Sequence, residues 1–198
     1  MARKIPGQPL LLADCLSQVA FIRVWQGKYQ GTEDLYRKAY DLRAKTGRHL
    51  SLALQTLVNI ASLYMTQGKD QAAEHLYTKV LEKTRRELGQ EHQMVSPILF
   101  RRGVLRKNHG RDREAIEDLK ECIRVEAKVR GARSDLVATA QLLLGEIYAR
   151  KKKVVEARRS FEAARTILER SQGGDRKRLL QRIERHLAAL DGKTRGDR

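Results

Sequence analysis

Small and apolar residues recur every three or four positions on both sides of a glycine in the middle of the chain. They are Leu57, Ile60, Ala61 and Tyr64 before Gly68, and Ala73, Tyr77 and Leu81 after it. This spacing predicts two helices joined by a tight turn. A single helical hairpin of this kind leaves an apolar face uncovered, so a stable fold requires neighbouring copies.

Four copies of the pattern follow one another, starting near Ala13, Leu54, Ser96 and Ala138, which are 41 or 42 residues apart. With each start counted as position 1, positions 8 and 20 are small and position 24 is large or apolar. They are Ala20, Ala61, Gly103 and Gly145 at position 8; Thr32, Ala73, Ala115 and Ala157 at position 20; and Tyr36, Tyr77, Leu119 and Phe161 at position 24. Position 10 is apolar in all four repeats, and in the first repeat it is Ile22. Small residues opposite large ones are typical of packed helices, so the sequence predicts an all-α protein of four helix-turn-helix repeats.

The repeats cover residues 13–172, and three further segments flank them. Residues 1–12 are expected to form an N-terminal arm, and residues 191–198 a flexible tail. An amphipathic stretch at 175–190 lies before the tail. A repeat array exposes its last apolar face unless an element with a polar outer side covers it. We therefore predict a C-terminal capping helix at 175–190.

Turn and cap residues indicate where the helices end. Gly27, Gly68 and Gly110 stand at the turn inside the first three repeats, whereas the fourth repeat has lysines there. Ser134 precedes the first helix of the fourth repeat, and serine is a favoured N-cap because its hydroxyl accepts a bond from a free backbone N–H. We expect Ser134 to begin that helix.

The pattern resembles the tetratricopeptide repeat family, most closely through Leu57, Ala61, Tyr64, Ala73 and Tyr77 in the second repeat and Leu144, Gly145, Tyr148, Ala157 and Phe161 in the fourth. The spacing exceeds the family's usual value of about 34 residues and is similar to the long repeats of the kinesin light chain type. The connector at 88–95, LGQEHQMV, is similar to the connector of that type, with Gln93 in place of a proline. The resemblance covers residues 13 to about 172 and implies a right-handed α-solenoid.

The resemblance also implies a concave groove, formed by the first helix (helix A) of each repeat, that binds a peptide. Positions 2, 5, 6, 9, 12 and 13 would face it, including Val58 and Leu142 at position 5. Asn59, at position 6, would bond a peptide backbone, and Arg101 at the same position would favour a carboxylate or phosphate. The expected partner-binding residues are Gln55, Asn59, Ser62, Thr66, Phe100, Arg101, Lys107, Asn108, Glu146 and Arg150.

Arginine replaces the family's usual residues in the third repeat. Arg102 stands at an apolar position, and Arg106 stands where repeats two and four have Tyr64 and Tyr148. The contrast with the intact second repeat indicates a basic partner site beside it. The alternative is that Arg101 and Arg102 are ordinary solvated charges on a degenerate repeat.

The chain carries 41 Lys and Arg against 24 Asp and Glu, a net charge of +17, which favours an acidic partner. Residues 150–198 alone hold 16 basic and 7 acidic residues. Two clusters with few acidic neighbours form the candidate basic patch: Lys151, Lys152, Lys153, Arg176, Lys177 and Arg178.

Two functions fit these features. The first is a protein-interaction scaffold or adaptor subunit that grips an acidic or mixed peptide segment inside a larger assembly. The second is a basic solenoid that binds a polyanion, either structural RNA in a ribonucleoprotein or an acidic protein lattice such as microtubules. Aromatic residues make up only 5% of the chain, which argues against stacking on many bases. Trp25, at groove position 13, is the exception.

Nothing in the sequence indicates catalysis, a metal or a cofactor. The five histidines stand singly, without the HExxH spacing of a metal site. Gly192-Lys193-Thr194 resembles the end of a phosphate-binding loop, but Leu187 occupies the position of that motif's first glycine. Ser and Asp residues form no arrangement of a nucleophile with a base. We therefore expect a non-enzymatic protein.

The cysteines and the hydropathy bear on the compartment. Cys122 falls where other repeats have small core residues, and Cys15 is far from it, so two reduced thiols in the cytoplasm are expected rather than a disulfide. An organelle matrix is the alternative, since the first 13 residues contain no acid. No apolar run reaches the roughly 20 residues of a membrane span. The sequence does not indicate an oligomeric state.

Overall fold

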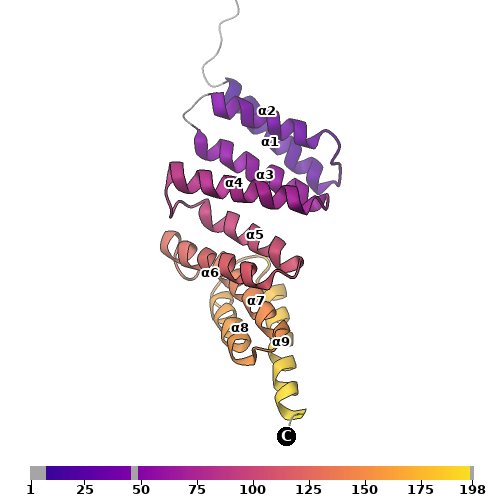
Figure 1. Cartoon of the computed structure of the whole chain (residues 1–198), viewed down its shortest axis with the longest axis vertical. Coiled ribbons are helices and arrows are strands. Elements are labelled where there is room, and N and C mark those ends of the chain that lie inside the picture. The colour runs from indigo at the N-terminus through magenta and orange to yellow at the C-terminus, as the bar shows by residue number, and fades with distance from the viewer. Residues whose placement is uncertain (1–7, 46–48, 197–198) are drawn as a thin grey trace, which may run out of the picture. The chain divides into compact units, whose positions relative to one another are not determined.

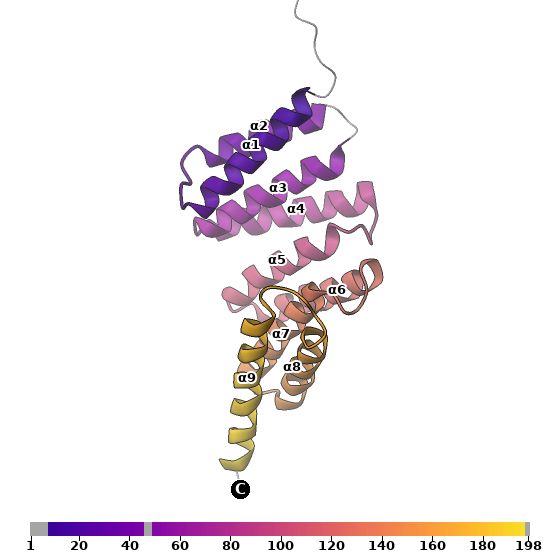
Figure 2. The same ribbon diagram turned by 180° about the vertical axis from the view of Figure 1, so that it is seen from behind.

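The computed structural model describes residues 8–45 and 49–196, with side chains to residue 191. That part of the chain contains nine helices and no strand (Figures 1 and 2), as predicted for an all-α repeat protein. The helices are α1 (Gln8–Trp25), α2 (Thr32–Lys45), α3 (Leu50–Thr66), α4 (Asp70–Leu88), α5 (Val95–Asn108), α6 (Asp112–Val129), α7 (Asp135–Arg150), α8 (Val154–Leu168) and α9 (Arg176–Gly196).

The chain divides into two compact units, Met1–Gln90 and Glu91–Arg198. In unit 1, α1 pairs with α2, α3 pairs with α4, and α2 packs against α3. In unit 2, α5 pairs with α6 and α7 with α8, while α6 packs against α7 and α9 against α8. Each unit therefore holds two of the predicted helical hairpins, and the division falls in the connector at 88–95.

The hairpins close because small residues in one helix face large ones in the next. Gly145 in α7 is the clearest case, since a Cβ added there would lie 2.5 Å from the ring of Phe161 in α8. At Gly103 the added atom would lie 3.2 Å from Leu119. The residues at positions 8, 20 and 24 of all four repeats are buried, as expected. Cys122 is also a buried core residue, and burial raises its pKa to about 12.

The turn inside each repeat needs a residue with positive φ. Gly27, Gly68 and Gly110 supply it at φ of 70°, 71° and 72°, and Lys152 takes the same place in the fourth repeat at φ 59°. A left-handed conformation costs an ordinary L-residue roughly 1–2 kcal/mol relative to glycine. The fourth repeat therefore keeps the turn geometry of the others with a less suitable residue.

Helix ends and one core position differ in part from the predictions. Ser134 caps α7 as expected, because its hydroxyl accepts a bond from Val137 N–H at 3.2 Å. Of the predicted arm, residues 8–12 belong to α1 and residues 1–7 lie outside the described residues. Helix α9 continues to Gly196, well past the predicted end at 190; residues 197 and 198 lie outside the described residues.

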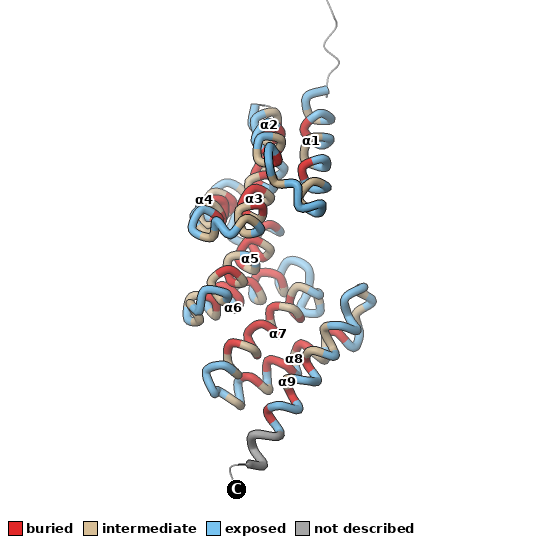
Figure 3. The backbone as a smooth tube through the Cα atoms, turned by 90° about the vertical axis from the view of Figure 1, so that its right-hand side faces the viewer, coloured by how far each residue is buried: buried red, intermediate tan, exposed pale blue. Residues whose placement is uncertain are grey.

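Ile22 is the core position that differs. It is 53% exposed, whereas Leu63, Leu105 and Ile147 at the same position are at most 2% exposed. Figure 3 shows why: α1 is buried on one side and exposed along the other. No helix of the described chain covers that outer side.

Candidate partner-binding groove

Helices α1 and α3, which are helix A of the first and second repeats, border a hollow. It measures about 290 Å³ and is lined by Asp14, Ser17, Gln18, Phe21, Arg43 and Asn59. Gln18 and Asn59 both occupy position 6, in successive repeats, so two side-chain amides border the same space. Asn59, one of the expected groove residues, is half-buried and lines this hollow.

Arg43, from α2, contributes a positive charge to the hollow's inner wall. Its side chain is only 7% exposed and lies 2.6 Å from the carboxylate of Asp14. It also donates to the Ser17 hydroxyl at 3.0 Å and to the Thr56 hydroxyl. Because the carboxylate of Asp14 is 54% exposed, the hollow presents a neutralised ion pair rather than an isolated cation.

The other predicted groove residues of unit 1 are exposed or half-buried on α3. The Gln55 amide donates to the Asn59 carbonyl oxygen at 3.3 Å, which leaves the Asn59 amino group without a hydrogen bond in the described chain. Ser62 lies 2.9 Å from the Tyr77 hydroxyl and donates to the Val58 carbonyl. Thr66 donates to the Leu63 carbonyl. Gln55 and Asn59 therefore retain more hydrogen-bonding capacity than the two hydroxyls.

Two aromatic side chains extend this face along α1. Trp25 is 78% exposed, and its ring meets that of Phe21 edge-on with 6.1 Å between centroids. Phe21 also lines the hollow. The exposed aromatic surface expected at Trp25 is present, one turn beyond the hollow.

In unit 2 two of the predicted charged groove residues pair with each other. Lys107 in α5 lies 3.0 Å from Glu146 in α7, which also pairs with Arg182 and lies 3.3 Å from the ring of His186 in α9. Burial alone would raise the pKa of Glu146, but bonds from Lys107 and Arg182 outweigh it and hold that pKa below its ordinary value. This carboxylate joins α5, α7 and α9.

The remaining groove residues of unit 2 differ in accessibility. Arg150 pairs with Asp112, whereas Arg101 and Asn108 are exposed and Phe100 is half-buried. Arg101 has no ionic partner among the described residues, so it can meet an incoming anion.

The expectation for position 5 is wrong in two repeats. Val58 is 2% exposed and Leu142 is fully buried. Leu142 packs into the core of α7, α8 and α9, so its side chain faces the core and cannot line an open surface. Phe100, at the same position of the third repeat, is half-buried.

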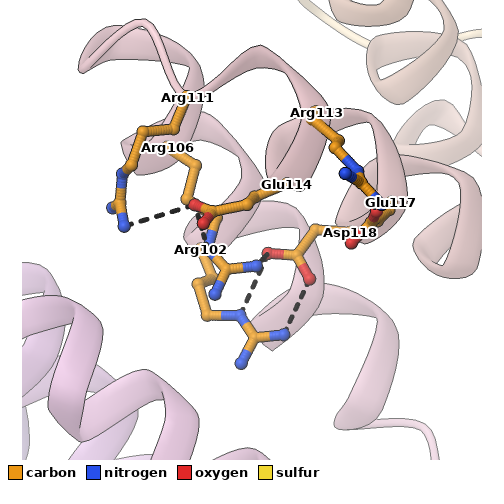
Figure 4. Close-up of polar contacts among 7 residues, drawn as sticks. All are labelled: Arg102, Arg106, Arg111, Arg113, Glu114, Glu117 and Asp118. Atoms are coloured by element: carbon orange, nitrogen blue, oxygen red, sulfur yellow. Dashed lines mark hydrogen bonds and ion pairs between the residues drawn. The ribbon is translucent and has the colours of Figure 1, made fainter.

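Arg102 and Arg106 do not present a basic surface. Figure 4 shows both guanidinium groups turned toward Asp118 of α6. Arg102 makes two bonds to the Asp118 carboxylate, at 3.0 and 2.7 Å, and Arg106 makes one at 3.0 Å. The side chains of Arg102, Arg106 and Asp118 are 12%, 17% and 5% exposed. The two arginines therefore hold α5 to α6, which corrects the sequence-based expectation of a partner site there.

The two basic clusters lie at opposite ends of the α7–α8 hairpin. Lys151 to Lys153 form the turn after α7, where Lys153 lies 3.7 Å from Glu156. Arg176 to Arg178 begin α9, close to the loop in which the Ser171 hydroxyl donates to Asp135 at the start of α7. All six side chains are exposed. They form two separate clusters rather than one continuous patch.

The described side chains include no group of three or more His, Cys, Asp or Glu residues that could hold a metal ion. None of the described helices is long and apolar enough to cross a membrane.

Residues 11–82 and 52–128 match the tetratricopeptide repeat family. The chain belongs to that family. Proteins of this family are generally non-enzymatic interaction scaffolds. None of the curated proteins compared with the chain is similar to it.

Solved structures share the fold at low sequence identity. BtubC (BKLC) from P. vanneervenii superposes with a TM-score of 0.78 at 20% identity, over 94% of this chain and 84% of that one. A single-residue variant of the nearly identical repeats of a putative kinesin light chain from Podosopora anserina gives 0.74 at 20% identity, over 98% and 92%. The apo form of RapI gives 0.75 at 12% identity, over 91% and 54%. The fold of this chain is thus similar to that of the putative kinesin light chain repeats.

Proposed function

We propose that this tetratricopeptide repeat protein is a non-enzymatic scaffold or adaptor subunit that holds a peptide segment of a partner protein along its helix A faces, within a larger assembly. The observation that carries the proposal is the hollow on α1 and α3, bordered by Gln18 and Asn59 at the same position of successive repeats. A side-chain amide can donate to a peptide carbonyl and accept from a peptide N–H. Two such amides one repeat apart suit an extended backbone of any sequence.

Charged and apolar side chains elsewhere on the helix A faces favour an acidic or mixed peptide. Arg101 is exposed and without an ionic partner in the described chain, and guanidinium groups bind carboxylates with paired hydrogen bonds. The net charge of +17 attracts acidic segments over longer distances. Phe21 and the exposed Trp25 add apolar surface beside the hollow, so a peptide that also carries an apolar residue would match this face.

The second candidate function is binding of a polyanion, such as structural RNA or an acidic protein lattice like microtubules. The observation that favours it is the exposure of Lys151, Lys152, Arg176 and Lys177 without ion pairs to described acids. Binding of this kind depends on counterion release and weakens steeply with salt.

Partner capture by two matched triple variants tests the proposal. The groove variant carries Gln18→Ala, Asn59→Ala and Arg101→Ala, and the cluster variant carries Lys151→Ser, Lys152→Gly and Lys153→Ser. Lost hydrogen bonds of about 1 kcal/mol each should weaken capture by the groove variant by tenfold or more, while the cluster variant binds normally. Capture should survive nuclease and raised salt. Undiminished binding by the groove variant would contradict the proposal, and partners that nuclease removes would favour the polyanion instead.

A further inference from the structure

A second hollow lies among three helices of unit 2, where α6 and α8 both pack against α7. We call it the α7 hollow. It measures about 360 Å³, and its most buried lining residues are Leu144 of α7 and Ser160 of α8, which are 3% and 7% exposed. The α7 residues that line it stand at positions 4, 7 and 11 of the repeat, and none of these is a predicted groove position. The α7 hollow is therefore separate from the candidate groove.

Polar residues on the α7 hollow replace leucines of other repeats. Gln141 stands at position 4, where Leu57 of unit 1 packs against a core cluster. Ser160 stands at position 23, where Leu76 packs against the same cluster. The fourth repeat therefore has hydrogen-bonding groups in place of apolar volume where the α7 hollow lies. Position 4 is a leucine in each of the other three repeats: Leu16, Leu57 and Leu99.

A tyrosine hydroxyl that is bonded in unit 1 is left without a partner in unit 2. Tyr64 donates to the Glu33 carboxylate at 2.8 Å and accepts a bond from Arg37 at 3.3 Å. Tyr148 stands at the same position of its own repeat and lines the α7 hollow. Ile116 stands at the position of Glu33 in the third repeat, and the Tyr148 hydroxyl has no hydrogen bond within the described chain. This hydroxyl can therefore bond a ligand.

Five polar side chains on the α7 hollow have no hydrogen bond or ion pair with another described residue. Two are cations, Lys120 of α6 and Arg159 of α8. The others are the hydroxyls of Tyr148 and Ser160 and the amide of Gln141. Ser160 is more than nine-tenths buried, and a buried hydroxyl without a partner destabilises a fold. An unpaired buried hydroxyl beside two unpaired cations indicates that a ligand supplies the missing acceptor.

These donors match a phosphate group better than a carboxylate. A phosphate monoester carries about −1.5 to −2 charges at neutral pH and has three strong acceptor oxygens, whereas a carboxylate has a single charge and two oxygens. Lys120 and Arg159 supply two positive charges, and guanidinium groups bind phosphate with paired hydrogen bonds. Glu156 also lines the hollow, but Lys153 lies 3.7 Å from its carboxylate and offsets its charge. The α7 hollow therefore attracts an anion.

Apolar residues on the α7 hollow indicate what carries the phosphate. Ile123, Leu144 and Ala163 line it together with the polar groups. Such a lining suits the carbon atoms of a side chain, which a free phosphate ion lacks. We propose that the α7 hollow binds a phosphorylated side chain of a partner protein. This binding does not depend on the proposed peptide groove, so either can fail alone.

Binding of a labelled peptide to the full chain tests the proposal. The probe is a fluorescein-labelled alanine peptide with one phosphoserine, its serine form is the reference, and fluorescence anisotropy gives both dissociation constants. Lys120→Gln with Arg159→Gln should bind the phosphopeptide about tenfold or more weakly than the wild type, because two charge-assisted contacts are lost. The matched control, Lys151→Gln with Arg176→Gln, loses the same charge from exposed positions outside the α7 hollow and should bind like the wild type.

A second variant changes the site without changing its charge. Gln141→Leu with Ser160→Leu restores the leucines of unit 1, fills the α7 hollow and removes two hydrogen-bonding groups. It should also raise the dissociation constant of the phosphopeptide by about tenfold or more. The midpoint of its thermal unfolding, followed by circular dichroism, should equal or exceed that of the wild type, because neither replaced side chain bonds another described residue.

Equal affinity of the wild type for the phosphoserine and serine peptides would overturn the proposal. So would equal phosphopeptide binding by Lys120→Gln with Arg159→Gln and by its control. Inorganic phosphate and free phosphoserine serve as competitors, and displacement by either as effective as by unlabelled phosphopeptide would show that the occupant is a small phosphate compound and not a protein. An RNA oligonucleotide that binds the wild type more tightly than the phosphopeptide, and is lost in Gln141→Leu with Ser160→Leu, would assign the hollow to nucleic acid instead.

Discussion

Removal of Asp118 should destabilise the protein far more than removal of a neighbouring surface carboxylate. The Asp118 side chain is 5% exposed and bonds both Arg102 and Arg106, which are 12% and 17% exposed. Breaking a buried ion pair from one side typically costs about 3–5 kcal/mol. Glu114 lies 3.9 Å from Arg106 and can compensate in part, so for Asp118→Ala we expect the lower value, about 3 kcal/mol.

Glu117→Ala is the matched control, one residue earlier on α6 (Figure 4). Glu117 pairs with Arg113 at side-chain exposures of 64% and 94%, and exposed pairs contribute at most about 1 kcal/mol. Urea unfolding followed by circular dichroism measures both variants. A third variant, Arg102→Leu with Arg106→Tyr and Asp118→Leu, restores the apolar pattern of the other repeats and should recover most of the loss. Equal stability of Asp118→Ala and Glu117→Ala would refute a structural role for the three residues.

Three further predictions concern packing, pH and thiol reactivity. Gly145→Ala forces a Cβ to within 2.5 Å of Phe161 and should cost roughly 1–3 kcal/mol in urea unfolding, whereas Gly174→Ala, with no atom within 4 Å, should change little. Because the pKa of Glu146 is lowered in the folded protein, its ionised carboxylate stabilises the fold above the ordinary pKa of 4.5, and this contribution is lost as pH falls through the lower folded value. The difference in unfolding free energy between the wild type and Glu146→Gln should therefore shrink in acid. A difference that stays constant with pH would contradict this. In thiol titration of the native protein, Cys15 should react quickly and Cys122, whose pKa burial raises to about 12, only after unfolding.

Helical periodicity and repeat spacing predicted most of the fold. The small residues at Ala61 and Gly145, and the large ones at Tyr77 and Phe161, stand where the structure buries them, because close helix packing requires both sizes at fixed positions. The exposure of Ile22 did not follow from its repeat position. Burial at that position comes from the preceding helix, and α1 has no such helix among the described residues.

The candidate site was predicted in part. Asn59 lines a hollow, and so does Gln18 at the same position of the first repeat, which is not among the residues that the sequence predicts for the groove. Arg102 and Arg106 indicate a basic partner site when their own helix is considered alone, because their acidic partner lies on the next helix. Asp118 was nevertheless a signal in the sequence, since it stands where the first two repeats have Leu35 and Leu76. An acid at an apolar position, together with two arginines at apolar and aromatic positions, indicates a buried ion network.

The most direct test of the central claim is site-specific photo-cross-linking from the hollow. A photoreactive residue replaces Gln18 in one variant and the solvent-exposed Val155 in another. Each variant is then mixed with a nuclease-treated sample that contains candidate partners and is irradiated. The account predicts a protein adduct from position 18 that an acidic peptide competes away, and no such adduct from position 155. Equal adducts from both positions, or cross-linking to RNA alone, would contradict a peptide-binding groove.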